Sequence, residues 1–365
     1  MKIKFLISFV FFLNFFESFC QDPSFSQFYN NSLYSNPAFA GCISGTRIVL
    51  SSRMQYTNVE NNNLWNSFNT EKLSLDFNIG TRDGLLNGIG LMITSDQEGG
   101  FLTTTKLGIP ISFVVVLKKK SKKSKQNLLL QVGGAASILF TSVDWSNMVF
   151  TDQLDPIYGN VNGTSFQTPQ NNLKPKLDVD AGAVLNYNFS FNGKGDNNKL
   201  LVGYAAHHIT QPNRSLKGFE YSTSNLPIKH TVFAQCFIVS KNNNDLGFEP
   251  LIVYESQAKM NTFLFGSSFK WKTYSIGIYN RSFNNADALI ICLSTIVNTD
   301  NRGPKRKKSF IISYSYDITI SGLSNRSGGS HEISLIADID RSLLGYFNFK
   351  RKKIQGKDSA PCPQW

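Results

Sequence analysis

The most constraining feature of this sequence is an alternation of apolar and polar residues with a period of two. Residues 309–318 show it clearly, and similar alternation occurs in residues 72–79, 101–117 and 179–189. In the first of these segments the apolar residues Phe310, Ile312, Tyr314, Tyr316 and Ile318 alternate with Ser309, Ser313, Ser315 and Asp317. Because successive side chains of a β-strand point to opposite faces, each segment predicts a strand with one apolar and one polar face.

Fourteen segments of the chain are predicted to be strands. In chain order they are 46–56, 71–80, 86–95, 102–117, 128–142, 178–190, 199–208, 229–240, 247–255, 261–271, 274–281, 287–297, 309–319 and 331–339. Glycine, asparagine and aspartate gather between several of them, as is typical of turns. Residues 229–240 and 247–255 alternate least regularly. An even number of strands places both ends of the predicted sheet on the same side.

The beginning of the sequence has the features of a secretory signal peptide. Two lysines precede the apolar stretch 5–16, and Ser18 and Cys20 stand at positions −3 and −1 if the chain is cleaved before Gln21. Cys20 also raises the alternative of a lipoprotein anchor. The bulky phenylalanine directly before Cys20 argues against that alternative, since lipoprotein signals resemble one another in having a small residue there. Ordinary cleavage is therefore the prediction.

Alternation alone does not separate a membrane barrel from a soluble β-sandwich, because both have one apolar face. After the N-terminal stretch no run of eighteen apolar residues occurs, so no transmembrane helix is predicted. A chain that crosses a bilayer without helices satisfies its backbone only as a closed barrel. The strand count, the export signal and the aromatic strand ends favour an all-β fold, a closed antiparallel transmembrane β-barrel integral to a bacterial outer membrane.

The predicted organisation has four parts. These are a signal peptide (1–20), an irregular N-terminal segment in or under the barrel (21–45), the barrel itself (46–339) and a periplasmic C-terminal tail (340–365). The segment 21–45 shows almost no strand alternation and contains several aromatic residues. Two interpretations of it remain open: a plug or docking peptide, or an extended lead-in that packs against the lumen wall.

Basic residues of the chain form clusters that the predicted topology places on one side of the barrel. The full chain carries a formal net charge of +12. Numbering the strands from a periplasmic start places the long connections 143–177 and 209–228 outside and short turns inside, as in outer-membrane barrels. Three basic clusters then fall on the periplasmic side, and they consist of Lys118, Lys119, Lys120, Lys122, Lys123 and Lys125; Lys305, Arg306, Lys307 and Lys308; and Lys350, Arg351, Lys352 and Lys353. Nucleic acid is set aside for an exported protein, which leaves anionic lipid, an acidic protein partner or solvated turns.

No residue pattern indicates catalysis or a cofactor. A GxSxG nucleophile motif is absent from the sequence. His207 and His208 are adjacent, so in a strand they are expected to point to opposite faces, and at most one could reach any given metal site. Oxygen-bearing residues in the long connection 143–177 suggest calcium, but the spacing of Asp152, Asp155, Asn160 and Asn162 matches no EF-hand loop. The prediction is a protein that is not an enzyme and that binds neither metal nor cofactor.

Four cysteines remain after the predicted cleavage: Cys42, Cys236, Cys292 and Cys362. The first and last strands of a closed barrel pair with each other. Cys42 lies just before the first predicted strand and Cys362 lies beyond the last, and an oxidising periplasm permits disulfides. A Cys42–Cys362 disulfide is therefore a candidate, and two free thiols are the alternative.

Several stretches resemble the PorP/SprF family of the type IX secretion and gliding-motility apparatus. The resembling stretches are QDPSFSQFYN (21–30), NPAFAG (36–41), GLMITSD (90–96) with Gly99, SYD (315–317) leading to GGSHEIS (328–334), and Cys362–Pro363 near the end. The lysine-rich turn at 118–125 and Cys42 directly after NPAFAG depart from the family pattern. The resemblance implies a barrel like the fatty-acid transporters that assists secretion or surface anchoring.

The partners that this resemblance implies are the periplasmic ring of the apparatus and one cognate adhesin or secreted protein with a C-terminal sorting domain. Outer-membrane lipid would surround the barrel. A channel or transporter for hydrophobic or small solutes is the alternative, since a barrel supports it equally. An outer-membrane enzyme is the third hypothesis, which the missing catalytic motifs disfavour.

Overall fold

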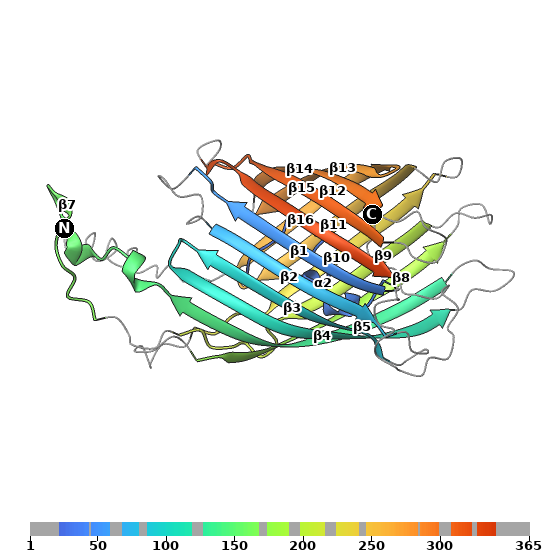
Figure 1. The fold of residues 1–365 in the computed structure, drawn as a ribbon, viewed down its shortest axis with the longest axis horizontal. Helices are drawn as coiled ribbons and strands as arrows, with labels where there is room; N and C mark the ends of the chain where they lie inside the picture. The colour runs from blue at the N-terminus through green and yellow to red at the C-terminus, as the bar shows by residue number, and fades with distance from the viewer. Residues whose placement is uncertain are drawn as a thin grey trace, which may run out of the picture.

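The computed structural model describes residues 22–43, 45–58, 68–79, 86–118, 127–167, 174–189, 198–215, 224–240, 246–283, 285–298, 308–322 and 327–340. Fourteen antiparallel strands in this part of the chain close into one barrel (Figure 1). They are β1 (Gly45–Gln55), β2 (Phe68–Asn78), β3 (Leu86–Glu98), β4 (Leu102–Lys118), β5 (Asn127–Val143), β8 (Lys176–Phe189), β9 (Asn198–His207), β10 (Lys229–Val239), β11 (Leu246–Gln257), β12 (Met260–Trp271), β13 (Tyr274–Phe283), β14 (Asn285–Asn298), β15 (Lys308–Thr319) and β16 (Ser330–Asp340). The predicted fold class and number of strands are confirmed.

Each strand of the barrel pairs with its neighbour in the chain, and β1 pairs with β16 to close the sheet. In that closing pair Gly45 lies opposite Asp340 and Gln55 lies opposite Ser330. We call the end where β1 begins and β16 ends the terminal end, and the opposite end the loop end. The long connections between β5 and β8 and between β9 and β10 both lie at the loop end.

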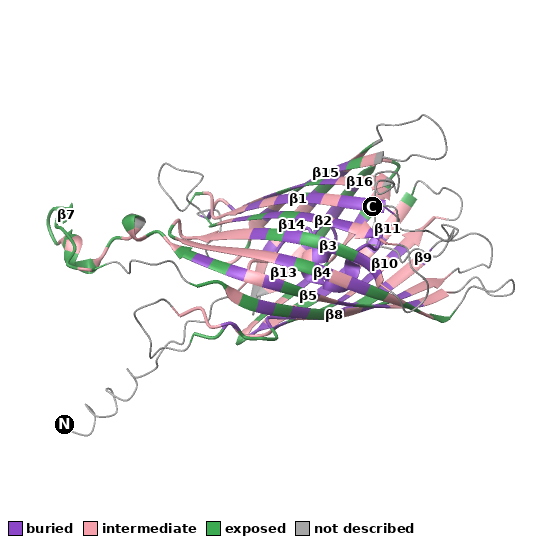
Figure 2. Cartoon of the chain, turned by 60° about the horizontal axis from the view of Figure 1, so that its bottom comes forward, coloured by how far each residue is buried: buried purple, intermediate pink, exposed green. Residues whose placement is uncertain are grey.

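The strands largely expose apolar side chains and bury polar ones, which is the reverse of a soluble protein. Ile312 on β15 is 47% exposed, whereas its neighbour Ser313 is completely buried. Buried and exposed positions alternate along the other strands as well (Figure 2). The exposed positions are largely apolar and many of the buried ones are polar, so the outer wall is largely apolar and the lumen side is largely polar. A soluble sandwich would bury the apolar face instead. The exposed apolar face therefore identifies a wall that contacts lipid.

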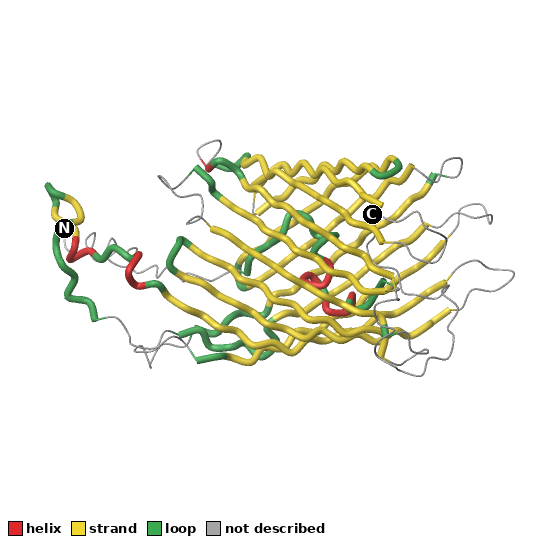
Figure 3. The backbone as a smooth tube through the Cα atoms, in the orientation of Figure 1, coloured by secondary structure: helices red, strands yellow, loops and turns green. Residues whose placement is uncertain are grey.

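The N-terminal segment, residues 22–43, lies inside the barrel (Figure 3). It forms two short helices, α2 (Ser32–Ser35) and the 3₁₀ helix η1 (Pro37–Phe39). Phe28 and Phe39 pack against Phe233 of β10, with ring centroids 5.1 and 5.7 Å apart. These rings belong to the largest apolar cluster in the lumen, which also contains Leu201 and Tyr279.

The connection between β5 and β8 forms an arm that projects beyond the loop end (Figure 1). It contains the 3₁₀ helices η2 (Trp145–Asn147) and η3 (Thr151–Gln153) and a small hairpin of β6 (Leu154–Asp155) and β7 (Gly159–Asn160). Throughout the residues that the structure describes, no helix is both long and apolar enough to span a membrane.

Candidate functional site

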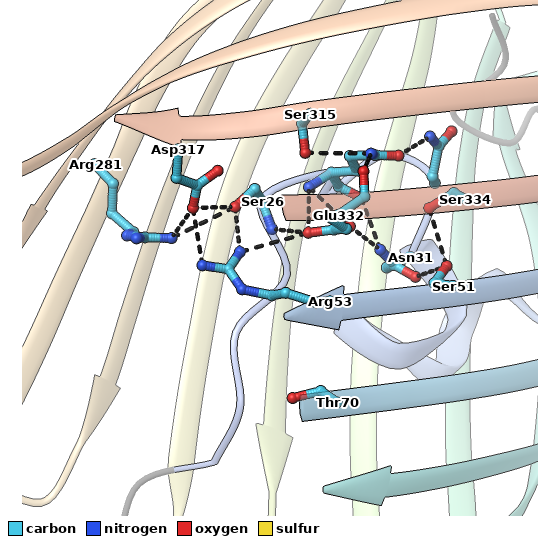
Figure 4. A network of polar contacts seen from close by, with 12 residues as sticks. Ser26, Asn31, Ser51, Arg53, Thr70, Arg281, Ser315, Asp317, Glu332 and Ser334 are labelled. Carbon is cyan, nitrogen blue, oxygen red and sulfur yellow. Dashed lines mark hydrogen bonds and ion pairs between the residues drawn. The ribbon is translucent and has the colours of Figure 1, made fainter. Parts of the chain in front are cut away.

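A buried group of charges lies where β1 closes on β16, and we call Arg53, Arg281, Asp317 and Glu332 the seam network (Figure 4). Arg53 donates to the Asp317 carboxylate at 2.8 Å and lies 3.4 Å from the Glu332 carboxylate. Arg281 reaches the same Asp317 oxygen from β13 at 3.0 Å. Arg53, Asp317 and Glu332 are almost completely buried. Charges removed from water are tolerated only when they are paired and hydrogen-bonded, which these are.

The seam network holds the N-terminal segment in place. Glu332 accepts hydrogen bonds from the backbone N–H of Ser26 at 2.6 Å and of Gln27 at 3.3 Å. The side-chain amide of Asn31 donates to the same carboxylate at 3.0 Å. The Ser26 hydroxyl donates to Asp317 at 2.7 Å. One pair of wall carboxylates therefore binds a segment that is about 300 residues away in sequence.

The NPAFAG stretch packs against glycines of the wall. Asn36 donates to the carbonyl oxygens of Ala183 and Tyr204 at 3.3 and 3.0 Å and accepts from the N–H of Ala38 at 2.9 Å. A methyl group placed on Gly133 of β5 would lie 2.5 Å from the Cα atom of Ala38. A methyl group placed on Gly182 of β8 would overlap the side chain of Asn36. The segment fits because these wall positions have no side chain.

A second buried group of charges lies at the loop end, and we call Asp22, Lys106, Asp178, Asp180 and His208 the loop-end cluster. The Asp22 carboxylate lies 2.5 Å from Nε2 of His208, whose Nδ1 lies 2.7 Å from Asp178. Lys106 of β4 lies 2.8 Å from both Asp178 and Asp180. The cluster therefore ties the start of the N-terminal segment to the wall.

The protonation of this cluster follows from its contacts. Burial alone would lower the pKa of His208, which lies just past the end of β9. The Asp22 and Asp178 carboxylates beside it outweigh that effect and raise the pKa of His208 to about 9. Burial would raise the pKa of Asp22, but the protonated His208 holds it well below its usual range. Both groups are consequently charged at neutral pH.

The expectation that His207 and His208 point to opposite faces is wrong. Both residues line the same pocket, where Nδ1 of His207 lies 3.6 Å from the Asp180 carboxylate and the backbone N–H of His208 donates to that carboxylate at 3.1 Å. The strand β9 ends at His207, and His208 has a left-handed backbone with φ of 58°. The alternation rule holds only for extended backbone, so it does not apply across this step.

The loop-end cluster has ligand types that a metal ion would accept. Ligand atoms of Asp178, Asp180 and His208 lie within 4.8 Å of one another. The ammonium of Lys106 already contacts both carboxylates, at 2.8 Å each. The positive charge between the aspartates is thus supplied by the protein itself, and the geometry is that of an internal ion network.

A pocket of about 680 Å³, partly open to solvent, lies beside the loop-end cluster. Asp22, Pro23 and Tyr34 form one side of it, and strands β3, β4, β5, β8, β9, β10 and β11 contribute the rest. The wall side chains are Met92, Thr94, Asp96, Glu98, Thr104, Lys106, Leu139, Asp180, His207, Lys229 and Glu255, and the β9–β10 connection adds His208, Arg214 and Leu226.

The calcium hypothesis for the arm has a simpler explanation. Asp152 accepts hydrogen bonds from Thr164 and Ser165, and Asp155 accepts from the backbone N–H groups of Ile157 and Tyr158. These N–H and O–H donors lower the pKa of both carboxyls. The two aspartates therefore stabilise turns within the arm.

The basic clusters were predicted as partner-binding residues, and most of them lie outside the described residues. Lys118 ends β4 and is exposed, and Lys308 begins β15. Both lie at the terminal end, so the connections that carry the first two clusters begin or end there. The members outside the described part are Lys119, Lys120, Lys122, Lys123 and Lys125; Lys305, Arg306 and Lys307; and Lys350, Arg351, Lys352 and Lys353.

Of the two candidate disulfide residues, Cys42 is buried and disulfide-bonded. Cys362 lies outside the described residues, so the Cys42–Cys362 pairing stays a prediction. Cys236 and Cys292 have free thiols.

Sequence reasoning missed the seam network and the loop-end cluster as sites. A signal was available: Asp178, Asp180 and Asp317 each stand between two apolar residues in or next to a predicted strand. Charged side chains on the lumen side of a strand are stable there when they are paired. The alternation indicates that such charges face inward, but it does not indicate which of them meet.

Comparison with known proteins gives one family and a set of similar barrels. The family described as type IX secretion system membrane protein PorP/SprF matches residues 17–336. No curated protein sequence matches the chain. Among solved structures, a Pseudomonas aeruginosa FadL homologue is similar at 12% identity, covering 85% of this chain and 94% of that one, with a TM-score of 0.39. The Pseudomonas putida toluene transporter TodX is similar at 10% identity, covering 84% of this chain and 92% of that one, with a TM-score of 0.36. Acinetobacter baumannii Omp33 is similar at 10% identity, covering 82% of this chain and 99% of that one, with a TM-score of 0.37.

Proposed function

This chain belongs to the PorP/SprF family of type IX secretion system membrane proteins, and from that premise we propose that it is a non-enzymatic adaptor barrel of the outer membrane. In this proposal it assists secretion or surface anchoring of one cognate adhesin or secreted protein that carries a C-terminal sorting domain. The terminal end of the barrel faces the periplasm and docks the periplasmic ring of the apparatus.

The filled lumen is the observation that supports an adaptor most directly. Residues 22–43 occupy the barrel interior and are bound by the seam network, by the wall glycines and by the loop-end cluster. An open diffusion channel needs a continuous path that water or solute can follow. A segment fixed by an ion pair at its start and by hydrogen bonds to buried carboxylates farther along favours a protein whose role is to bind other proteins.

The basic clusters support the docking part of the proposal. Two of them lie in connections whose flanking strands end at the terminal end, and like charges placed together contribute nothing to folding by themselves. Opposed charge fields speed and orient the docking of an acidic partner. Exposed charges are screened beyond about 8 Å at physiological salt, so the attraction acts at close range.

Deleting the gene and cataloguing surface and secreted proteins tests the secretion role. Loss of one adhesin or secreted protein with normal solute uptake is the expected result. A growth defect on a lipid or small solute with an unchanged surface proteome would support the transporter instead. Complementation with the wild-type gene must restore the missing protein.

Charge reversal tests the docking role separately. Changing Lys305, Arg306, Lys307 and Lys308 together to glutamate should leave the barrel inserted but weaken recovery of periplasmic partners, more at low salt than at high salt. Lys174→Glu with Lys176→Glu, at the loop end, is the matched control and should leave recovery unchanged. Undiminished recovery after reversal of all three clusters would contradict ring docking through these charges.

One observation favours the transporter alternative. The loop-end pocket has a partly apolar lining and lies at the end of the barrel that carries the long connections. In this alternative the pocket would be the entry site for a hydrophobic or small solute, and the solute-uptake measurement above separates the two functions.

A further inference from the structure

The loop-end pocket contains both paired and unpaired charges. Among its cations, Lys106 is held by Asp178 and Asp180, and Lys229 lies 3.0 Å from Glu255. Its remaining acids, Asp96 and Glu98, form no ion pair within the part of the chain that the structure describes.

Asp96 and Glu98 are two residues apart on β3, so they lie on the same face of the strand. Asp96 accepts a hydrogen bond from the Thr70 hydroxyl at 2.6 Å, and the Asp96 and Glu98 side chains are hydrogen-bonded to each other. The Arg214 guanidinium enters the same pocket, donates to Thr104 at 2.5 Å and interacts electrostatically with both acids. Two neighbouring carboxyl groups favour a shared proton when no cation pairs with them directly, and a bound cation that contacts both would replace that proton.

A second feature points to a ligand independently of these acids. Thr94 lies on the same face of β3, lines the pocket and is only 5% exposed. Among the residues that the structure describes, its hydroxyl has no hydrogen-bond partner. A buried polar group without a partner costs free energy, which a water molecule or a bound ligand offsets by hydrogen bonding to it.

The floor of the pocket is apolar. Met92, Leu139 and Leu226 are each less than 5% exposed and all line it. A bare divalent cation such as calcium requires six to eight oxygen ligands, and this floor offers none. The floor suits a methylene chain, and the oxygens of Thr94, Asp96 and Glu98 suit the donors of a cationic group.

We propose that the loop-end pocket binds an organic cation, namely an ammonium or guanidinium group on an aliphatic stem. The stem lies on Met92, Leu139 and Leu226, and the cationic group donates to Asp96, Glu98 and Thr94. Two sources share this chemistry: a free alkylamine, and a lysine or arginine side chain presented by a peptide. A fatty carboxylate would place its negative charge against Asp96 and Glu98. The proposal does not depend on the secretion role.

Calorimetric titration of the purified full-length barrel in detergent at low salt tests the proposal. The probes are n-hexylamine, 1-hexanol, hexanoate and a capped Ala-Lys-Ala tripeptide. Saturable binding of one hexylamine per barrel is expected, with hexanol and hexanoate at least about ten-fold weaker. Tripeptide binding about ten-fold tighter than hexylamine would assign the peptide source, and weaker tripeptide binding would assign the free amine.

Variants locate the site. Asp96→Asn and Glu98→Gln should each weaken hexylamine binding about ten-fold, and Thr94→Val should weaken it less. Asp155→Asn, which removes an acid on the arm that does not line the pocket, is the control and should leave binding unchanged. Because Asp96→Asn and Glu98→Gln keep size and shape, the heat-modified mobility of each variant on gels should match the wild type.

Three results would overturn the proposal. Hexanoate binding as tightly as hexylamine would show that the pocket does not select cations. Hexylamine binding that survives Asp96→Asn combined with Glu98→Gln would place the amine elsewhere. Calcium that abolishes hexylamine binding at equimolar concentration would show that the acids serve a metal ion.

Discussion

At the scale of single residues, the N-terminal segment is held by a few buried carboxylates, each of which serves several donors. Glu332 alone accepts from Ser26, Gln27 and Asn31 while it lies beside Arg53. Removing such a carboxylate leaves its donors buried without an acceptor. The free-energy cost of these unsatisfied groups is larger than the net stabilisation that the ion pair contributes. The seam network is therefore a sensitive point of the molecule.

Glu332→Ala tests that sensitivity. It leaves Arg53 short of a counter-charge and three donors without an acceptor, so the free energy of unfolding should fall by about 3–5 kcal/mol. Urea titration of the barrel in lipid vesicles provides the measurement. Glu71→Ala on β2 is the matched control, because Glu71 is exposed and accepts a long hydrogen bond from Asn69 at 3.4 Å. Equal destabilisation by the two changes would contradict the role of the network.

The loop-end cluster predicts a pH dependence. His208 has a pKa raised from 6.5 to about 9, so its contribution is complete below pH 6.5 and is lost as the pH rises through about 9. Asp22 has a pKa lowered from 3.8, so its contribution is complete above pH 3.8 and is lost as the pH falls through the lowered value. The contact between Asp22 and His208 should be strongest between about pH 4 and 6.5.

Hydrogen exchange of residues 22–26, corrected for the intrinsic effect of pH, measures this. Protection should fall between pH 7 and pH 10 in the wild type. His208→Gln should show lower protection at pH 7 and no further fall by pH 10. Constant protection in the wild type over this range would mean that His208 does not hold the segment.

At the scale of elements, the fit between η1 and the wall depends on glycines that an alternation pattern treats as neutral. Gly133 and Gly134 are adjacent on β5, yet only the first faces η1. A methyl group on Gly133 would lie 2.5 Å from Ala38, whereas one on Gly134 would lie 3.5 Å from its nearest neighbour, the carbonyl oxygen of Asp180. Gly134 therefore tolerates an added methyl group, whereas Gly133 does not.

Gly133→Ala should shift η1 away from β5 and lower the free energy of unfolding by about 1–3 kcal/mol, because backbone cannot yield as a flexible side chain does. Gly134→Ala should be close to neutral. Urea titration compares the stabilities, and single-barrel conductance in planar bilayers reports displacement of the N-terminal segment. Similar stability and conductance for the two variants would show that η1 does not pack here as described.

At the scale of the whole molecule, the outer wall should be in contact with lipid. Ile312 lies near the middle of β15 and points outward, so Ile312→Arg should cost roughly 2–4 kcal/mol of stability in a bilayer. Leu246→Arg, at the first residue of β11, places the same charge near the membrane surface and should cost only about 0–1 kcal/mol. Refolding into vesicles followed by denaturant titration gives both values, and equal costs would contradict a lipid-facing wall.

The disulfide prediction concerns two cysteines that flank the paired strands β1 and β16 in the sequence. Cys42 precedes β1 and is disulfide-bonded, and Cys362 follows β16 in the sequence. Peptide mapping of the protein under non-reducing conditions should find one linked peptide containing both cysteines. Recovery of Cys362 in a separate alkylated peptide would end this assignment.

The sequence by itself determined the fourteen strands, the direction in which their apolar faces point and hence the closed barrel, because alternation is a local property repeated in every strand. Only the tertiary structure decided where residues 22–43 lie and which buried charges meet. Arg53 and Asp317 are 264 residues apart and become neighbours only when β1 closes on the last strands. His207 and His208 reach one pocket only because β9 ends between them. Such contacts depend on closure and on where each strand stops, and a periodic pattern encodes neither.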